Sequence, residues 1–418
     1  MNPAMQFNLA HDKPMHILIA PNAFKNALAA DLVAAAIRRG LSRSRLSATC
    51  ETFPVGDGGD GTGDLLIRQC GGERIPAVAR DPFGKKIDTY WGLAAKAKIP
   101  AAAQTPAAAQ TLAAQPPPAA APPPAITAVI EMANASGLRL LDARRLDPLH
   151  ASSAGTGDLI RAALDRGAER IIVCMGGSAT VDGGTGILQA LGARFLDGGG
   201  ELLKALPADL ATLDRIDMSD IHPRLATTEL VVVCDVENPL LGPGGAAAVF
   251  GPQKGASPEA IIRLETGLGQ FAKVIARQTG KDVGSLPRGG TAGGAAAGLH
   301  GLLSANLVSG IDYFLDITDF NGALERSTLV ITGEGKIDNQ TFAGKAPYGV
   351  ALRARARCIP VIAFTGSSPA DPDSVHLCFD QVIGINPPAI GLEEALRDTA
   401  SNLEKAAMEW ANRRAGLG

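Results

Sequence analysis

Short apolar runs alternate with helical patterns along most of the chain. Residues 15–21 (MHILIAP) form a continuous apolar run typical of a buried strand, and residues 27–41 repeat apolar positions at helical spacing and include Gly40 near their end. The same order recurs at 168–177 followed by 185–195, at 327–335 followed by a helix ending near Arg357, and in the strand-like runs 358–367 and 380–385. Strands rich in Val and Ile that alternate with helices predict an α/β fold with mainly parallel sheets.

The length and two unusual segments bear on domain organisation. At 418 residues, with 46% hydrophobic residues, the chain exceeds what one core usually supports, so we expect two domains. Residues 1–14 lack the basic start and apolar stretch of a signal peptide and are expected to be a disordered lead-in. Residues 99–125 are rich in Ala and Pro, and the prolines and glutamines would break a membrane-spanning helix. We expect that segment to be a surface loop between two strands.

Charge and cysteine usage exclude several classes of protein. The formal net charge of −3 is spread over both signs without a basic stripe, which argues against a nucleic-acid partner and favours a small-molecule ligand. None of the six cysteines falls in a CxxC pair, so neither a zinc knuckle nor a disulfide framework is expected. The cysteines are therefore interpreted as reduced thiols of a cytoplasmic protein with no membrane partner.

Glycine-rich loops follow the predicted strands. They occupy residues 21–27, 55–64, 175–186, 234–245 and 332–345. Glycine exposes backbone N–H groups and a following helix adds partial positive charge, so such loops favour phosphate-like anions. In parallel sheets, ligands bind at the carboxyl ends of strands, where these loops are expected. For any single loop, a tight turn remains an equally good interpretation.

Known nucleotide motifs are only partly matched. Walker A requires Ser or Thr after Gly-Lys, and none follows the lysines at Lys85, Lys281, Lys336 and Lys345. A GxGxxG match at Gly56, Gly58 and Gly61, between a strand-like and a helical run, keeps a nicotinamide-dependent dehydrogenase open. Against it, Asp57 and Asp60 would face a pyrophosphate that is already negative.

The acidic loop VGDGGDGTGD (55–64) fits a magnesium–phosphate site better than a calcium site. The calcium repeat GGxGxD fails because Gly63 stands where aspartate is needed. Magnesium typically uses one or two protein carboxylates and completes its shell with phosphate oxygens and water. We therefore expect Asp57 and Asp60 to serve a metal while the glycines admit a phosphate.

Basic and acidic groups suited to phosphoryl transfer stand in the other loops. Lysines beside glycine turns can neutralise transferring phosphate charge; they are Lys25, Lys254, Lys336 and Lys345. Asp182 and Asp235 each follow an apolar run, where partial burial would let a carboxylate accept a proton from a substrate hydroxyl. Asp182 is the first choice for this base and Asp235 the alternative.

These motifs, taken in order, resemble the bacterial glycerate kinase type 1 family (glycerate 2-kinases). The resemblance rests on IAPNAFKNALAADLVAAAI, VGDGGDGTGDLL, RDPFGKKI, TAVIEMANASGL, AGTGDLIRAALDRGA, GGSATVDGGTGILQALGARF, CDVENPLLGPGGAAAVFGPQKGA and LVITGEGKIDNQTFAGKAPYGVA. It implies phosphorylation of D-glycerate at its 2-hydroxyl by ATP with Mg²⁺. It also implies a Rossmann-like domain from residues 15–80 and 315–418, an α/β domain inserted at 81–314 and a site in the interdomain cleft.

On this interpretation the candidate residues divide into three sets. The catalytic set is Asp182, Asp235, Lys25 and Lys254 and the metal set is Asp57 and Asp60. The nucleotide-binding set is Gly58, Gly59, Gly176, Gly177, Ser178, Gly333, Glu334, Gly335, Lys336 and Asp338. A homodimer is left open, and a sensor that binds phosphorylated metabolites without turnover is a further alternative.

A few positions depart from the family pattern. The first loop usually reads PDSFKGS, but Asn22, Ala23 and Asn26 replace its acid, serine and glycine. Val181 stands where asparagine is usual, and Asp60 replaces glutamate. These changes leave the acidic and basic groups in place, although Val181 is expected to bear on substrate orientation or rate.

Overall fold

The computed structural model describes residues 14–94, 126–338, 341, 344–367, 378–387 and 390–416. The chain divides into two compact units. Unit 1 comprises Met1–Val55 and Asp319–Gly418, and unit 2 comprises Gly56–Thr318. Most of the predicted lead-in and the whole of the predicted Ala/Pro loop at 99–125 lie outside the described residues, so both stay predictions.

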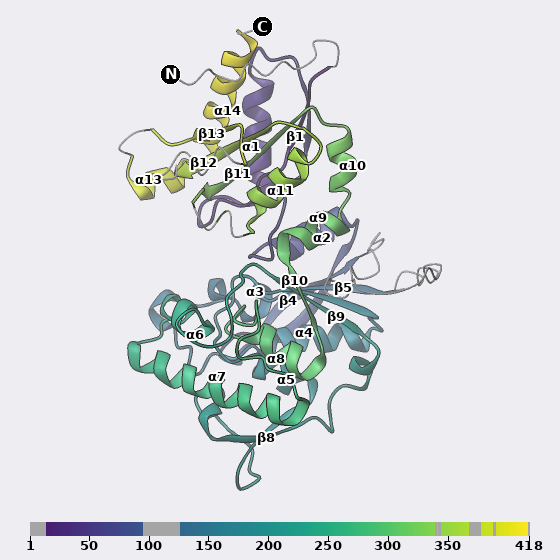
Figure 1. Ribbon diagram of the computed structural model, residues 1–418, viewed down its shortest axis with the longest axis vertical. Helices are drawn as coiled ribbons and strands as arrows, with labels where there is room; N and C mark the ends of the chain where they lie inside the picture. The colour runs from purple at the N-terminus through teal and green to yellow at the C-terminus, as the bar shows by residue number, and fades with distance from the viewer. Residues whose placement is uncertain are drawn as a thin grey trace, which may run out of the picture. The chain divides into compact units, whose positions relative to one another are not determined.

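Unit 1 is built on a five-stranded parallel sheet in the order β13-β12-β11-β1-β2. The strands are β1 (His16–Ile19), β2 (Thr49–Thr52), β11 (Leu329–Lys336), β12 (Val361–Ser367) and β13 (Gln381–Gly384). The helices are α1 (Ala30–Ser42), α10 (Phe320–Glu325), α11 (Ala346–Arg355), α13 (Leu392–Arg397) and α14 (Thr399–Ala415). Helices α1 and α14 lie side by side (Figure 1), and a Cβ at Gly40 would lie 2.2 Å from the carbonyl oxygen of Glu404. Glycine at that position therefore permits their close packing.

Unit 2 is built on a six-stranded sheet in the order β10-β9-β6-β5-β4-β3. The strands are β3 (Glu73–Arg80), β4 (Lys86–Ala94), β5 (Thr127–Glu131), β6 (Arg170–Cys174), β9 (Glu229–Cys234) and β10 (Asn306–Ser309). Strands β5, β6, β9 and β10 are parallel, whereas β4 pairs antiparallel with both β3 and β5. The carboxyl ends of four strands thus meet at one edge of the sheet.

Helices and a hairpin complete unit 2. The hairpin is formed by β7 (Arg194–Asp197) and β8 (Leu213–Asp217). The helices are α2 (Thr62–Gln69), α3 (Ala133–Ser136), α4 (Ala154–Asp165), α5 (Thr185–Leu191), α6 (Ala246–Phe250), α7 (Pro258–Thr279), α8 (Ala295–Leu303) and α9 (Gly310–Ile317). Short 3₁₀ turns lie at η1 (Leu138–Leu140), η2 (Ala143–Arg145), η3 (Leu210–Thr212), η4 (Pro223–Ala226) and η5 (Pro252–Lys254). Fully buried Phe195, Phe271 and Leu268 join the sheet residues in one core.

The predicted α/β class with mainly parallel strands is confirmed, and two details differ. The helix expected over 185–195 ends at Leu191, because Gly192 adopts φ 115° and residues 194–197 enter β7. Residues 56–80, expected in the same domain as the chain ends, belong to unit 2, where β3 pairs with β4 and α2 packs on β5. Among the helices that the structure describes, none combines the length and apolar character that a membrane crossing requires.

Candidate active site

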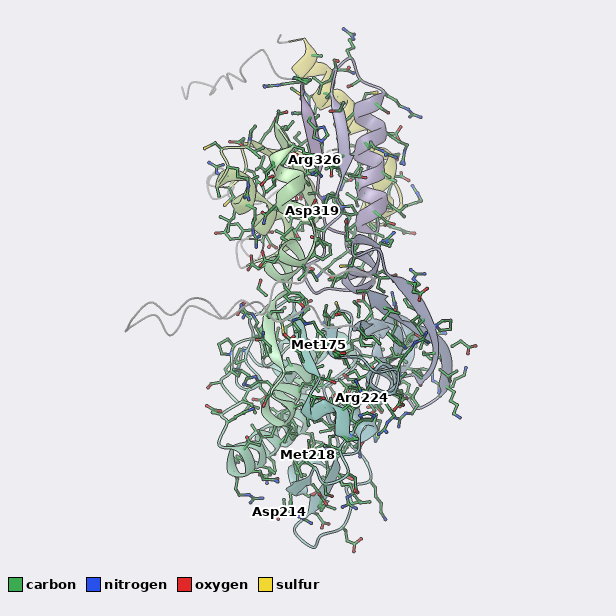
Figure 2. The ribbon with its side chains drawn as sticks, turned by 90° about the vertical axis from the view of Figure 1, so that its right-hand side faces the viewer. Met175, Asp214, Met218, Arg224, Asp319 and Arg326 are labelled. Atoms are coloured by element: carbon green, nitrogen blue, oxygen red, sulfur yellow. The ribbon has the colours of Figure 1, made fainter. Side chains whose placement is uncertain are left out.

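The acidic loop 56–61 lies across the carboxyl ends of the parallel strands of unit 2. Gly176, just after β6, donates from its backbone nitrogen to the carbonyl oxygen of Gly58 at 2.9 Å. A Cβ at Gly310, just after β10, would lie 1.9 Å from the carbonyl oxygen of Asp57. Met175, labelled in Figure 2, lies between the end of β6 and Gly176 and marks the strand end that this contact involves. Glycines at these positions therefore let the loop rest directly on the strand ends.

The carboxylates of Asp57 and Asp235 converge on Gly59. A Cβ placed at Gly59 would lie 3.0 Å from Oδ1 of Asp57 and 4.0 Å from Oδ2 of Asp235. Asp57 is 8% exposed, and its Oδ1 accepts a hydrogen bond from the Gly59 nitrogen at 3.2 Å. Asp235 follows β9 directly and is partly exposed. The fold thus brings together two acids that stand 178 positions apart in the sequence.

Asp60 has a cationic partner that the sequence analysis did not identify. The guanidinium of Arg139, in η1, lies 3.1 Å from Oδ1 of Asp60 and also donates to the carbonyl oxygen of Ala133 and to the side chain of Asn134. Both charged side chains are nearly half exposed. The negative charge of Asp60 is therefore balanced from within the protein.

Lys254 is a buried lysine in η5. It is 3% exposed, and its Nζ donates to Oγ of Ser178 at 2.8 Å and to the carbonyl oxygen of Thr180 at 2.7 Å. Burial lowers the pKa of Lys254 to about 8, against the opposing effect of Asp182 and Asp235. This lysine therefore binds the predicted phosphate loop 175–186 and lies close enough to both candidate bases to feel their charge.

Asp182 is an anchor for its own loop. Oδ2 accepts from the Ser153 nitrogen at 2.8 Å, the Ser153 hydroxyl at 2.7 Å and the Gly186 nitrogen at 3.2 Å, while Oδ1 accepts from the Gly184 nitrogen at 3.1 Å. The residue is 1% exposed. A carboxylate that is sealed and already accepts four hydrogen bonds does not suit a base that must reach a substrate hydroxyl. The geometry favours a structural role for Asp182, and its choice as the base stays a prediction.

The donor set around the acidic loop is compatible with a magnesium ion shared with phosphate. Among the described residues, no group of three or more His, Cys, Asp or Glu side chains is arranged to hold a metal without other ligands. Magnesium needs only one or two carboxylates when phosphate oxygens complete its shell. Asp57, beside Asp235, fits that requirement better than Asp60, whose charge is paired with Arg139.

The predicted nucleotide-binding residues of unit 1 lie at the carboxyl end of β11. Gly333 accepts a hydrogen bond at its carbonyl oxygen from the Asn22 nitrogen at 2.9 Å. Glu334 is 7% exposed, and its Oε1 accepts from Oγ1 of the fully buried Thr341 at 2.5 Å. The same hydroxyl oxygen accepts from the Asp338 nitrogen at 3.1 Å. Thr341 therefore ties the strand end to the turn that follows it.

Two of the predicted lysines are exposed at this same strand end of unit 1. Nζ of Lys336 lies 3.1 Å from Oδ2 of Asp338. A Cβ at Gly335 would lie 3.5 Å from the backbone nitrogen of Lys25, so the 21–27 loop runs beside the end of β11. Lys25 and Lys336 are thus neighbours by fold, although 311 positions separate them.

The GxGxxG match does not form a dinucleotide-binding unit. That motif requires a strand, a tight turn and a helix of one βαβ unit. Here β2 pairs with β1 in unit 1, whereas α2 packs on β5 in unit 2. The GxGxxG match therefore gives no support to a nicotinamide-dependent dehydrogenase.

Comparison with known proteins identifies the family. The sequence profile described as "Glycerate kinase family" matches residues 17–414. The chain belongs to the glycerate kinase family. It is 40% identical to a glycerate kinase of Halalkalibacterium halodurans over 94% of this chain and 97% of the relative. It is 39% identical to a glycerate 2-kinase of Escherichia coli K12 over 95% and 97% of the two chains.

A solved structure agrees with this family membership. A crystal structure provisionally named glycerate kinase 2 from Salmonella typhimurium LT2 superimposes with a TM-score of 0.75 at 38% identity, over 97% of this chain and 100% of that one. The glycerate kinase family expected from the motifs is therefore confirmed.

Departures from the family pattern find local explanations. Asn26, where glycine is usual, has φ 63°, a conformation that asparagine tolerates better than most residues. The Asn22 side chain accepts from the Ala23 nitrogen at 2.8 Å, which stabilises the turn locally. Val181 is fully buried in the core of unit 2. Its effect on the reaction stays a prediction.

The sequence analysis of this glycerate kinase passed over residues that contact the candidate loops. Glu131 ends the apolar run TAVIE, the same signal of an acid after a strand that had singled out Asp235. The segment RGGTAGG (288–294) is as rich in glycine as the loops that were chosen. Its Gly293 accepts from the Gly183 nitrogen at 3.0 Å and so supports the turn that follows Asp182.

Proposed function

We propose that this chain transfers a phosphoryl group from ATP to the 2-hydroxyl of D-glycerate, giving 2-phosphoglycerate and ADP. The observation that carries the proposal is the match to the glycerate kinase family over residues 17–414, together with 39% identity to a glycerate 2-kinase of Escherichia coli over 95% of the chain. The arrangement of acids and a buried lysine in unit 2 supports the same reaction class.

Asp235 is proposed as the base. It directly follows β9 and is partly exposed, whereas Asp182 is sealed among donors from its own loop and from Ser153. A base must come within hydrogen-bond reach of the proton that it removes. Asp235 meets that requirement of access, and Asp182 instead holds the loop that carries Gly176, Gly177 and Ser178.

Lys254 is proposed to carry positive charge for the phosphate. Its ammonium group is held by Ser178 and Thr180 and lies in the field of Asp182 and Asp235. A positive charge that is already in place, at a position with little water, stabilises the negative charge that develops in the transition state. The site does not have to rearrange to provide it. The loop glycines Gly58, Gly59, Gly176 and Gly177 are proposed to admit the phosphate close to the backbone.

A magnesium ion is proposed at Asp57, with Asp60 as the second acid of the same loop. When bound, Mg²⁺ neutralises charge on the phosphate oxygens. Asp57 lies beside Asp235 at the position of Gly59, and Asp60 is held by Arg139. The protein's part is to keep these acids in a fixed loop.

Unit 1 is proposed to contribute groups for ATP. The glycines Gly333 and Gly335 leave the backbone open at the end of β11, and Lys25 and Lys336 supply positive charge there. Glu334 and Asp338, which Thr341 connects, are proposed to orient this strand end. We also propose that the enzyme works in the cytoplasm, and a homodimer stays a prediction.

The test is incubation of the protein with ATP, Mg²⁺ and D-glycerate, followed by enolase. Enolase converts the 2-phosphate to phosphoenolpyruvate and does not use the 3-phosphate. Phosphoenolpyruvate is expected, at a rate proportional to the protein added. ADP without phosphoenolpyruvate would assign transfer to the 3-hydroxyl, and no ADP with D-glycerate would favour the sensor that binds metabolites without turnover.

A further inference from the structure

Glu131 holds the helix that follows the acidic loop. It is the last residue of β5 and is 4% exposed. Its Oε1 accepts from the Gly61 nitrogen at 3.0 Å and its Oε2 from the Gly63 nitrogen at 2.6 Å. Gly61 is the N-cap of α2, where no side-chain cap is present. Glu131 therefore supplies, from a distant strand, the acceptor oxygens for N–H groups at a helix N-terminus that has no side-chain cap of its own.

The contact with Glu131 leaves little room for a side chain at position 63. A Cβ at Gly63 would lie 2.6 Å from Oε2 and 3.1 Å from Cβ of Glu131. Gly61 has φ 91°, a conformation that other residues rarely adopt. Two glycines of the motif DGGDGTGD thus have a role in admitting a carboxylate from inside the protein.

The contact reaches Asp57 through one further residue. Thr62 lies between the two glycines that Glu131 binds, and its Oγ1 accepts from the Gly58 nitrogen at 3.1 Å. Gly58 is the neighbour of Asp57, and its carbonyl oxygen accepts from Gly176 at 2.9 Å. Fixing residues 61–63 therefore also fixes the backbone on which Asp57 stands.

The charge balance around Glu131 is unfavourable for stability. Burial, with Asp60 as the next largest cause, raises the pKa of Glu131 to about 8, while the two backbone N–H groups and Arg139 oppose that rise. A neutral acceptor could bind the same two backbone N–H groups without the cost that burial and a nearby acid impose on a carboxylate. Groups of this kind concentrate at functional sites.

We propose that Glu131 is a positioning residue of the phosphoryl-transfer site, holding the acidic loop 57–61 in its working geometry through Gly61, Gly63 and Thr62. This inference deepens the proposed function and rests on it. Outer partners that orient the groups holding a metal or substrate typically change activity by about 10- to 100-fold when replaced. Glu131 acts on the reaction through the loop and does not itself touch substrate.

The test compares two variants with a matched control in the full chain. Glu131→Gln keeps the shape of the side chain but turns an amide N–H₂ toward a backbone N–H. Gly63→Ala keeps Glu131 and pushes on its carboxylate, although alanine is the better helix former. Glu73→Gln removes an exposed glutamate at the start of β3 in the same unit and serves as the control. Each protein is assayed with ATP, Mg²⁺ and D-glycerate well below its own melting temperature, and amide hydrogen exchange is followed over residues 56–66.

For both Glu131→Gln and Gly63→Ala we expect kcat to fall about 10- to 100-fold. Exchange at 57–63 should be faster, with Glu73→Gln unchanged in both measurements. The double variant should be no worse than the poorer single variant, because both act on one contact. A purely structural Glu131 would lower the melting temperature yet leave kcat and KM at wild-type values in the folded protein, and that result would overturn the proposal.

The exchange measurement separates this proposal from the proposed function. If the wild-type protein forms no phosphorylated product, the proposed function fails, and the role of Glu131 in catalysis fails with it. The claim that Glu131 holds the loop is then tested by hydrogen exchange alone. Unchanged exchange in both variants would contradict that claim. If Glu131→Gln does not fold, Gly63→Ala decides the matter by its own kcat.

Discussion

Ser153 binds one oxygen of Asp182 twice, from its backbone nitrogen at 2.8 Å and from its hydroxyl at 2.7 Å. The same hydroxyl oxygen accepts from the Ile187 nitrogen at 3.1 Å. The start of α4 and the start of α5 are thus joined through one buried carboxylate. Asp182 is consequently a residue on which the local fold depends.

We expect Asp182→Asn to destabilise unit 2. The amide would turn an N–H₂ group toward backbone donors in a site that is 1% exposed, at a cost of about 2–4 kcal/mol. The chain has only two tryptophans, and Trp91 lies in unit 2 while Trp410 lies in unit 1. Denaturant unfolding in a Trp410→Phe background therefore reports unit 2 through the buried Trp91. An unchanged midpoint would return Asp182 to the list of candidate bases.

Asp235→Asn should give the opposite pattern. Asp235 is partly exposed, so unfolding of the variant should differ from that of the wild type by less than about 1 kcal/mol. Its kcat for D-glycerate should fall about 10²- to 10⁴-fold if it is the base. The assay is the enolase-coupled formation of phosphoenolpyruvate. Turnover at the wild-type rate would remove Asp235 from the base role.

Lys254 should make stability rise with pH above 8. Its pKa is lowered from 10.5 to about 8 in the fold, so between these values the unfolded chain binds more protons than the folded one. The free energy of unfolding should therefore increase by about 3 kcal/mol between pH 8 and 10.5 because of this group. Below pH 8 the lysine is charged in both states, so the full cost of burying its charge lowers the stability there. Lys254→Met should lack this rise, whereas Lys273→Met, at an exposed lysine of α7, should keep it.

Activity should fall over the pH range in which the contribution of Lys254 to stability rises. If the charged form carries the phosphate, kcat should fall as pH rises through about 8, while Lys254→Met should be slow at every pH. The measurement is kcat at saturating substrates from pH 7 to 10. A wild-type kcat that stays constant across that range would contradict a role for the charge.

Asp57→Asn should raise the magnesium requirement. Replacing one of the few carboxylates that serve Mg²⁺ weakens its binding, so half-maximal activity should need at least about tenfold more Mg²⁺. Asp88→Asn, at an exposed position of β4, is the matched control and should keep the wild-type titration curve. Equal magnesium curves for wild type and Asp57→Asn would show that the loop shapes the turn or binds substrate without serving the metal.

Much of the fold and of the site follows from local pattern. The alternation of apolar strands with helices predicts the α/β class because burial and periodicity act within a few residues. The glycine-rich segments after strands predict the loops that the structure places at the ends of β6, β9 and β11. The same local patterns single out three charged residues that lie together in unit 2, namely Lys254, Asp57 and Asp235.

Only the tertiary structure decided how each acid is buried and which groups bind it. Asp182 and Asp235 look alike in the sequence, since each follows an apolar run. In the structure Asp182 is buried and hydrogen-bonded to Ser153, whereas Asp235 stays partly exposed. The bond from Gly63 to Glu131 joins residues 68 positions apart. Burial and partners of a carboxylate depend on chain segments that no local window contains. The sequence therefore determined which chemical groups are present, and the packing of distant segments determined which of them are buried and hydrogen-bonded and which stay accessible.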